Sequence, residues 1–130
     1  MKKTILLPIF AILLLLLVSK DGNAQTKATS TFQVIQFHSE HRCMTCNKIE
    51  EITKIALKKY PAISFSLVNA DDKKNEKICA QFEASGSSLF LYNTKTKKIK
   101  NLTEMAFMNA GDQDKFIKEF NKNMDAFLKS

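Results

Sequence analysis

The sequence predicts an α/β domain in which a mixed four-stranded sheet is flanked by helices, with the elements in the order βαβαββα. Short runs of β-branched and aromatic residues alternate with segments of helical period along the chain. A helical segment separates the first two runs, and this favours parallel strands, because a parallel connection needs a crossover. A hairpin turn joins the last two runs and should add an antiparallel edge strand.

The first half of the domain should begin with a buried strand at residues 31–38, since residues 32–37 read Phe-Gln-Val-Ile-Gln-Phe. A helix is expected next, because apolar side chains then recur at three- and four-residue steps. These side chains are Ile49, Ile52, Ala56 and Tyr60. The helix should end near Tyr60, since Pro61 cannot continue it. Residues 63–68 alternate and then become apolar, which predicts the second strand.

Turn residues divide the second half. Asn-Ala-Asp-Asp at residues 69–72 supplies a turn and an N-cap for a helix near residues 74–82. A third strand is expected at residues 88–92. Residues 93–96 then form the hairpin turn into an edge strand at residues 97–102, whose lysines would discourage unwanted pairing.

The last helix has the clearest pattern. Asp112 is expected to cap it, and a continuous apolar stripe along it predicts a core face. The stripe consists of Phe116, Ile117, Phe120, Met124, Phe127 and Leu128. Residues 105–110 are expected to be an apolar loop before this helix. That loop would either line a docking surface near Cys43 and Cys46 or pack under the helix.

The first 24 residues have the pattern of an export signal. A basic start is followed by an almost entirely apolar run at residues 5–18, and Gly-Asn-Ala at residues 22–24 fits the small-residue rule for signal peptidase. The run is shorter than the roughly 20 residues of a membrane span, so cleavage after Ala24 is expected, with an uncleaved anchor as the alternative. The mature protein would be periplasmic or secreted. It would have a flexible lead-in at residues 25–31 and one domain at residues 32–130.

The charge distribution argues against nucleic acid as a partner. The formal net charge is +7, but Arg42 is the only arginine, and the lysines are scattered instead of being grouped with aromatic residues. Proteins that bind nucleic acid cluster basic side chains with stacking residues. We therefore expect no nucleic acid, no membrane contact once the signal is cleaved, and a monomer.

Cys43 and Cys46 carry the main chemical signal, as the motif Cys-Met-Thr-Cys between the first strand and the first helix. Two thiols at a helix start can close as a disulfide, and the unpaired N–H groups and the helix dipole favour a thiolate there. An exported protein meets an oxidising compartment. A close pair of thiols is then either a working redox couple or a structural staple, and exchange is the leading interpretation.

Neighbouring side chains suggest assisting roles. Arg42 would favour a thiolate at Cys43, and so would His41 when it is protonated. His38 and His41 could also move protons near the thiols, although His41 is equally expected to be a solvated loop residue. Cys79 is expected to be a small apolar core residue. No cofactor is expected, because the chain has no Gly-rich phosphate loop and only three glycines.

The first strand, the Cys-x-x-Cys motif and the following βαββα order resemble the thioredoxin fold over residues 32–128. Within that superfamily the chain is most similar to a small group of exported bacterial proteins that carry the name nitrophenyl compound nitroreductase subunit ArsF. The matching pieces are the histidine-containing strand end and residues 42–46, 85–89, 101–103 and 106–110. The resemblance implies a thioredoxin-like thiol–disulfide oxidoreductase whose partner is a protein thiol or disulfide.

The resemblance also implies roles for single residues. Cys43 would be the attacking thiol and Cys46 the resolving thiol. The chain departs from thioredoxin at three places. Arg-Cys-Met-Thr-Cys at residues 42–46 replaces Trp-Cys-Gly-Pro-Cys, Phe37 aligns with the buried strand aspartate, and Ser88 aligns with the cis-proline that faces the cysteines. Ser88 would leave space beside the sulfurs.

Two other functions stay open. A thiolate pair also binds soft metals such as copper, zinc or arsenite. In that case Cys43 and Cys46 would be the ligands, with His38, His41 and Met44 as nearby candidates. No second Cys or His pair at ligand spacing occurs in the sequence. The third possibility is a non-catalytic interaction subunit of a reductase.

Overall fold

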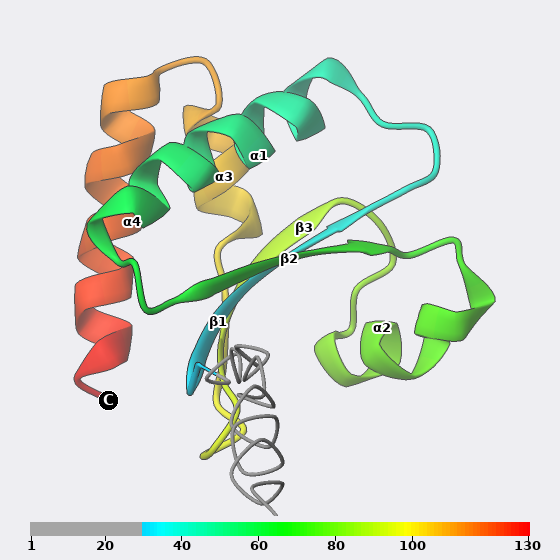
Figure 1. Cartoon of the computed structure of the whole chain (residues 1–130). Helices are drawn as coiled ribbons and strands as arrows, with labels where there is room; N and C mark the ends of the chain where they lie inside the picture. The colour runs from blue at the N-terminus through cyan, green and yellow to red at the C-terminus, as the bar shows by residue number, and fades with distance from the viewer. Residues whose placement is uncertain (1–29) are drawn as a thin grey trace, which may run out of the picture.

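The computed structural model describes residues 30–130; the predicted signal peptide and nearly all of the predicted lead-in lie outside this range. A mixed sheet of four strands organises the described chain (Figure 1). Its strands are β1 (Phe32–His38), β2 (Ser64–Asn69), β3 (Ser88–Asn93) and β4 (Ile99–Asn101), in the spatial order β2-β1-β3-β4. β1 pairs with β2 in parallel, and β3 pairs antiparallel with both β1 and β4. The predicted fold class, with its parallel first pair and its edge hairpin, is confirmed.

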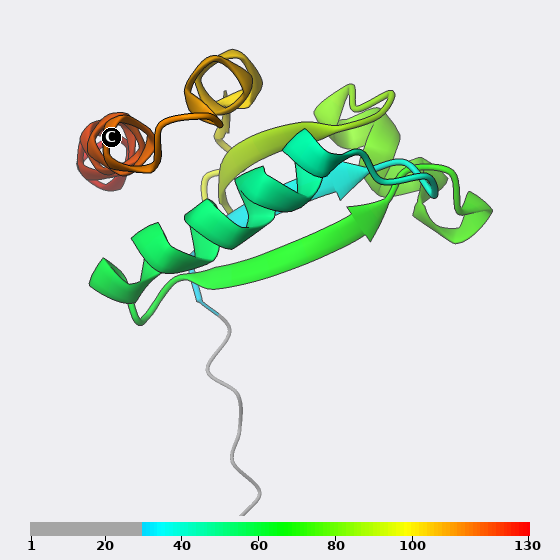
Figure 2. The ribbon, with the colours of Figure 1, turned by 90° about the horizontal axis from the view of Figure 1, so that it is seen from above.

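Helices cover both faces of this sheet (Figures 1 and 2). The helices on one face are α1 (Met44–Ala56), α3 (Thr103–Asn109) and α4 (Gln113–Leu128), and α2 (Glu76–Phe82) lies on the other face. The short 3-10 segments η1 (Leu57–Lys59) and η2 (Lys73–Asn75) extend α1 and precede α2. Within residues 30–130, none of the helices combines the length and the apolar character needed to cross a bilayer.

The alternation of side chains along β1 and β3 divides the core into two layers. Val34, Leu89 and Leu91 face α1 and α4, whereas the residues next to them along the strands, such as Ile35 and Phe90, face α2. This follows from the two-residue period of a strand, which sends successive side chains to opposite faces. As a result, one step along β1 decides whether a side chain lies on the α1 face or on the α2 face.

The predicted core stripe of α4 is confirmed. Asp112 caps the helix by accepting the backbone N–H of Lys115 at 3.0 Å. The stripe residues Phe116, Phe120, Met124 and Phe127 are buried, and Ile117 and Leu128 lie half-buried at its edge.

The prediction of a loop at residues 105–110 is wrong, because most of this segment forms helix α3. The side chain of Asn101 accepts the backbone N–H of Thr103 where the helix begins, and Ala106 is fully buried in the core. A helix of seven residues shows barely two turns of apolar period, which sequence pattern alone does not separate from a loop. Its outer side chains stay in solvent, with Phe107 40% and Met108 75% exposed.

Candidate redox site at the start of helix α1

The Cys-x-x-Cys motif lies where the chain leaves β1 and enters α1. Cys43 is the N-cap residue of α1, with an extended backbone, and Cys46 lies in the first turn of the helix. The backbone N–H of Cys46 donates to the Cys43 sulfur at 3.1 Å. In an ordinary N-cap this position is taken by a serine or aspartate oxygen. One of the unpaired N–H groups of the helix therefore points at the sulfur of Cys43.

A disulfide joins Cys43 to Cys46, whose Cα atoms are 5.2 Å apart. The two residues differ in accessibility: Cys43 is exposed, whereas only 3% of Cys46 is exposed. A thiolate that approaches from solvent therefore meets the sulfur of Cys43 first. The sulfur of Cys46 leaves or attacks from the protected side of the bond.

The buried polar residue beneath the motif is Gln36. Its side-chain amide donates to the backbone carbonyl of Cys46 at 2.9 Å, and its Oε1 has no hydrogen-bond partner within residues 30–130. Phe37 instead packs in the α2 layer, against the rings of Phe82 and Phe90. The resemblance aligns Phe37 with the buried strand aspartate, and the polar side chain that lies beneath the motif in this chain is that of its neighbour Gln36. Gln36 is one of two amides in the run at residues 32–37, so the sequence alone gives only a weak signal for it.

Ser87 is the serine that contacts the motif, with its Oγ 3.1 Å from the sulfur of Cys46. Ser88 begins β3 and donates its hydroxyl to the backbone carbonyl of Gly86 at 3.1 Å. The residue range 30–130 contains no cis peptide bond. Within residues 30–130, Ser88, which the resemblance aligns with the cis-proline, therefore makes no hydrogen bond to either motif sulfur.

Arg42 forms an ion pair with α1. Its guanidinium lies 2.7 Å from the carboxylate of Glu50, which also pairs with Lys54. Burial on its own would raise the pKa of Glu50, but hydrogen bonds from Lys54 and Arg42, together with their charges, outweigh it and lower that pKa. Much of the positive charge of Arg42 is thus balanced by Glu50, which weakens the expected effect of Arg42 on Cys43. The segment between β1 and α1, residues 39–43, is called the motif loop below. The pair of Arg42 with Glu50 also links this loop to the second turn of α1.

The lowered pKa of Glu50 leads to a pH-dependent stability prediction. A carboxylate whose pKa falls on folding stabilises the native state above its ordinary titration range, and this contribution is lost as the pH falls through the folded pKa. Glu50→Gln should therefore lower the free energy of unfolding by about 1 kcal/mol at neutral pH and by much less in acid. Urea unfolding under both conditions measures this. Glu51→Gln, which removes an exposed pair with Lys48, is the control. An equal loss at both pH values would contradict the prediction.

The two histidines lie in or beside the motif loop. His38 ends β1, and its ring Nδ1 lies 2.9 Å from the carbonyl of Ser39. That nitrogen therefore carries a proton, because a carbonyl can only accept. His41 is exposed. The part of the chain that the structure describes contains no hydrogen bond from either ring to a cysteine sulfur, and no group of three or more His, Cys, Asp or Glu side chains arranged to hold a metal ion.

The motif loop is held against the turn that follows β2. The backbone N–H of Glu40 donates to the carboxylate of Asp71 at 2.8 Å, and the N–H of Ala70 donates to the carbonyl of His38 at 2.8 Å. These two bonds fix the exit of β1, so the position of Cys43 depends on the sheet as well as on α1.

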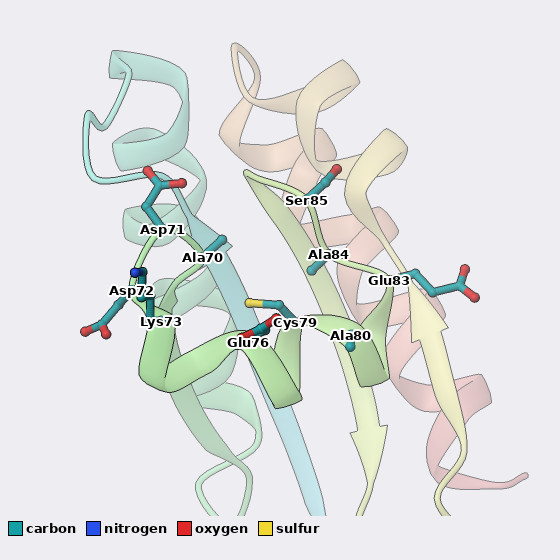
Figure 3. A pocket seen from close by; sticks show the side chains of 10 residues that line it. All are labelled: Ala70, Asp71, Asp72, Lys73, Glu76, Cys79, Ala80, Glu83, Ala84 and Ser85. Carbon is teal, nitrogen blue, oxygen red and sulfur yellow. The ribbon is translucent and has the colours of Figure 1, made fainter.

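Among the hollows on the surface of the described chain, two bear on the cysteines. One, of about 300 Å³, lies beside the motif and is lined by Met44, Thr45, Lys48, Ala110 and Gly111. The other, of about 680 Å³, lies between the turn after β2 and helix α2 and contains neither motif cysteine (Figure 3). Cys79 lies in the wall of this second hollow and packs half-buried against the α2 layer. Cys79 is expected to be a buried core residue; it contacts the core of the α2 layer, but it is only half-buried.

A Cys-x-x-Cys motif at a helix start, after the central strand of a β2-β1-β3-β4 sheet, is the arrangement that the resemblance implies. The fold is thioredoxin-like. No protein-family model matches the chain, and no curated protein matches its sequence.

The solved structures to which the chain is similar include three thioredoxins. Thioredoxin O2 from Arabidopsis thaliana, in the oxidized state, is 21% identical with a TM-score of 0.45, and the match covers 53% of this chain and 60% of that one. Fasciola hepatica thioredoxin is 19% identical with a TM-score of 0.45, covering 55% and 66%. Thioredoxin f2 of Chlamydomonas reinhardtii is 21% identical with a TM-score of 0.44, covering 65% and 82%. The chain thus spans less than two thirds of the length of the first two.

Proposed function

We propose that the protein is an exported thiol–disulfide oxidoreductase that exchanges electrons with a protein partner through Cys43 and Cys46. The observation that carries the proposal is the asymmetry of the disulfide. One sulfur is exposed and accepts a helix N–H, while the other is buried beside it. A structural staple needs no such difference, whereas exchange needs one sulfur that a partner reaches and one that it does not.

The reaction proceeds through a mixed disulfide. In the reducing direction, the thiolate of Cys43 attacks one sulfur of the partner's disulfide, and the partner's other sulfur leaves with the electron pair. Cys46 then attacks the sulfur of Cys43, and the partner's first sulfur leaves as a thiolate. The partner gains two electrons, and the Cys43–Cys46 disulfide forms. The reverse sequence oxidises a partner dithiol, and the N–H of Cys46 stabilises the Cys43 thiolate in both directions.

The surface around Cys43 suits a polypeptide partner. Met44 is 89% exposed, and its side chain forms part of the wall of the hollow of about 300 Å³ beside the motif. Phe107 and Met108 add exposed apolar area on α3. Methionine adapts its shape to different apolar partners at low cost. A partner segment that carries its disulfide to Cys43 would thus find an apolar contact next to the reacting sulfur.

Two finer proposals accompany this function. The protein is exported with cleavage after Ala24, on the basis of the basic start and the apolar run that follows it. It is also a relative of the exported ArsF group, on the basis of the shared motif pieces. Neither proposal assigns a nitroreductase reaction to this chain.

A redox titration tests the proposed exchange. The Cys79→Ala variant, which keeps only the motif thiols, is equilibrated with glutathione buffers of graded ratio, quenched in acid and alkylated. We expect the motif to change from disulfide to dithiol within the range of physiological poise, at roughly −180 to −300 mV. A disulfide that stays closed at every such ratio would identify a staple and overturn the proposal. Stoichiometric copper, zinc or arsenic in the protein purified reduced and without oxygen would instead favour a metal-binding role.

A further inference from the structure

Each sulfur of the disulfide has a hydrogen-bond donor of its own. The sulfur of Cys43 accepts the backbone N–H of Cys46 at 3.1 Å, and the sulfur of Cys46 lies 3.1 Å from the hydroxyl of Ser87. Gln36 also contacts Cys46, but it binds the backbone carbonyl and not the sulfur. Within residues 30–130, the hydroxyl of Ser87 is the only hydrogen-bonding group on the Cys46 sulfur.

The position of Ser87 is fixed by the elements on either side of it. Ser88 begins β3 and pairs with Phe37 of the central strand, while its hydroxyl is engaged with the carbonyl of Gly86. At Gly86 the loop passes close to the motif loop, because a Cβ atom there would lie 3.8 Å from the hydroxyl of Ser39. Ser87 therefore lies between the start of β3 and the contact of Gly86 with the motif loop, and this places its hydroxyl beside Cys46 in the first turn of α1.

Because Cys46 is buried, the hydroxyl of Ser87 can stabilise a negative charge that solvent does not reach. When the disulfide opens, the sulfur of Cys46 takes up the electron pair of the broken bond and becomes a thiolate. Only 3% of Cys46 is exposed, so little water can solvate that charge. A buried anion without a donor is strongly disfavoured, which would slow the departure of Cys46. A hydroxyl at hydrogen-bond distance relieves this cost, since bonds from a donor to an ionised acceptor are the strong ones.

We propose that Ser87 is a catalytic residue of the exchange, whose hydroxyl donates to the Cys46 sulfur as that sulfur leaves or attacks as a thiolate. This rests on the proposed function. A partner thiolate attacks the sulfur of Cys43, the Cys43–Cys46 bond breaks, and a partner–Cys43 disulfide forms. The electron pair passes to the Cys46 sulfur, which the Ser87 O–H then stabilises. A second partner thiolate next attacks the bonded partner sulfur and expels Cys43 as a thiolate. The partner ends as a disulfide and the motif as a dithiol.

Ser87→Ala tests the proposal, with two matched variants. Ser88→Ala removes the neighbouring hydroxyl, which is bound to Gly86 instead, and Ser87→Thr keeps a hydroxyl at the site. The first measurement is the rate at which dithiothreitol opens the disulfide. The second is the thiolate titration of Cys46, followed by ultraviolet absorbance in a Cys43→Ser/Cys79→Ala background, where it is the only thiol. Thermal unfolding of each oxidised variant shows whether the fold is kept.

Ser87→Ala should slow the opening of the disulfide about tenfold and raise the pKa of Cys46 by about one unit, the effect of losing one hydrogen bond to an ionised group. Ser88→Ala should change neither quantity, and Ser87→Thr should restore both toward the original values. An unchanged Cys46 titration in a folded Ser87→Ala protein, or equal effects in both alanine variants, would overturn the proposal. The titration needs no partner, so it distinguishes a failure of this inference from a failure of the proposed exchange function.

Discussion

Replacing Cys43 by serine should abolish disulfide exchange. Cys43 supplies the exposed sulfur, and the backbone N–H of Cys46 that stabilises its thiolate would point at a hydroxyl in the variant. A hydroxyl does not ionise near neutral pH and forms no disulfide, so the rate of exchange should fall by about 10³-fold or more. The measurement is the rate of reduction or oxidation of a model disulfide peptide by the purified variant.

Replacing Cys46 by serine should leave a partner covalently attached to Cys43. In Cys46→Ser the sulfur of Cys43 still attacks, but no second thiol opens the mixed disulfide, which should accumulate. Non-reducing electrophoresis and mass spectrometry of the complexes from expressing cells would identify the partner. The N-terminal residue of the recovered protein should be Gln25 if export proceeds as proposed.

Cys79→Ser is the matched control for this experiment, because Cys79 is a half-buried thiol on the other face of the sheet. It should trap nothing and leave exchange unchanged. If Cys46→Ser traps no partner, or if Cys79→Ser abolishes exchange, the motif does not act in the proposed way. A protein that binds partners without any mixed disulfide would favour the non-catalytic interaction role.

Phe120→Ala should cause the largest loss of stability. Phe120 has no exposed surface, lies in the middle of the α4 stripe, and stacks on Phe116 with 6.2 Å between the ring centroids. Removing a buried phenyl ring costs about 3–5 kcal/mol, because the cavity collapses only in part. The total free energy of unfolding of such a domain is about 5–15 kcal/mol, so much of it would be lost.

Urea unfolding of the oxidised protein measures this loss. Lys118→Ala, an exposed change on the same helix, should alter the free energy of unfolding by less than about 0.5 kcal/mol. A loss below about 1.5 kcal/mol in Phe120→Ala would mean that the stripe does not carry the core in the way its burial implies.

The elements that the sequence predicts well are those with a long or strongly alternating pattern. The run at residues 32–37 forms β1 with residues 34–37 buried, and the stripe of α4 buries four of its six side chains, with Ile117 and Leu128 half-buried. Helix α3 is predicted as a loop because its seven residues are too few for apolar periodicity to distinguish a helix from an apolar loop. The motif cysteines were found because their spacing is short and local.

Sequence pattern does not identify the residues that contact the motif from other parts of the fold. Gln36 and Ser87 reach Cys46 from β1 and from the loop before β3, and neither carries a sequence pattern that places it beside the sulfurs. A shift of one residue along a strand reverses the face to which a side chain points, so only the strand register settles such contacts. The pairing of Arg42 with Glu50 also depends on how the motif loop meets α1.

The amide of Gln36 has a mechanical consequence. It anchors the first turn of α1 to the central strand through the Cys46 carbonyl, at a point where almost no solvent could replace the bond. If the first turn of α1 moved away from β1, a second polar atom of the Gln36 amide would be left without a partner in the interior. The backbone around Cys43 and Cys46 should therefore move little when the disulfide opens or closes.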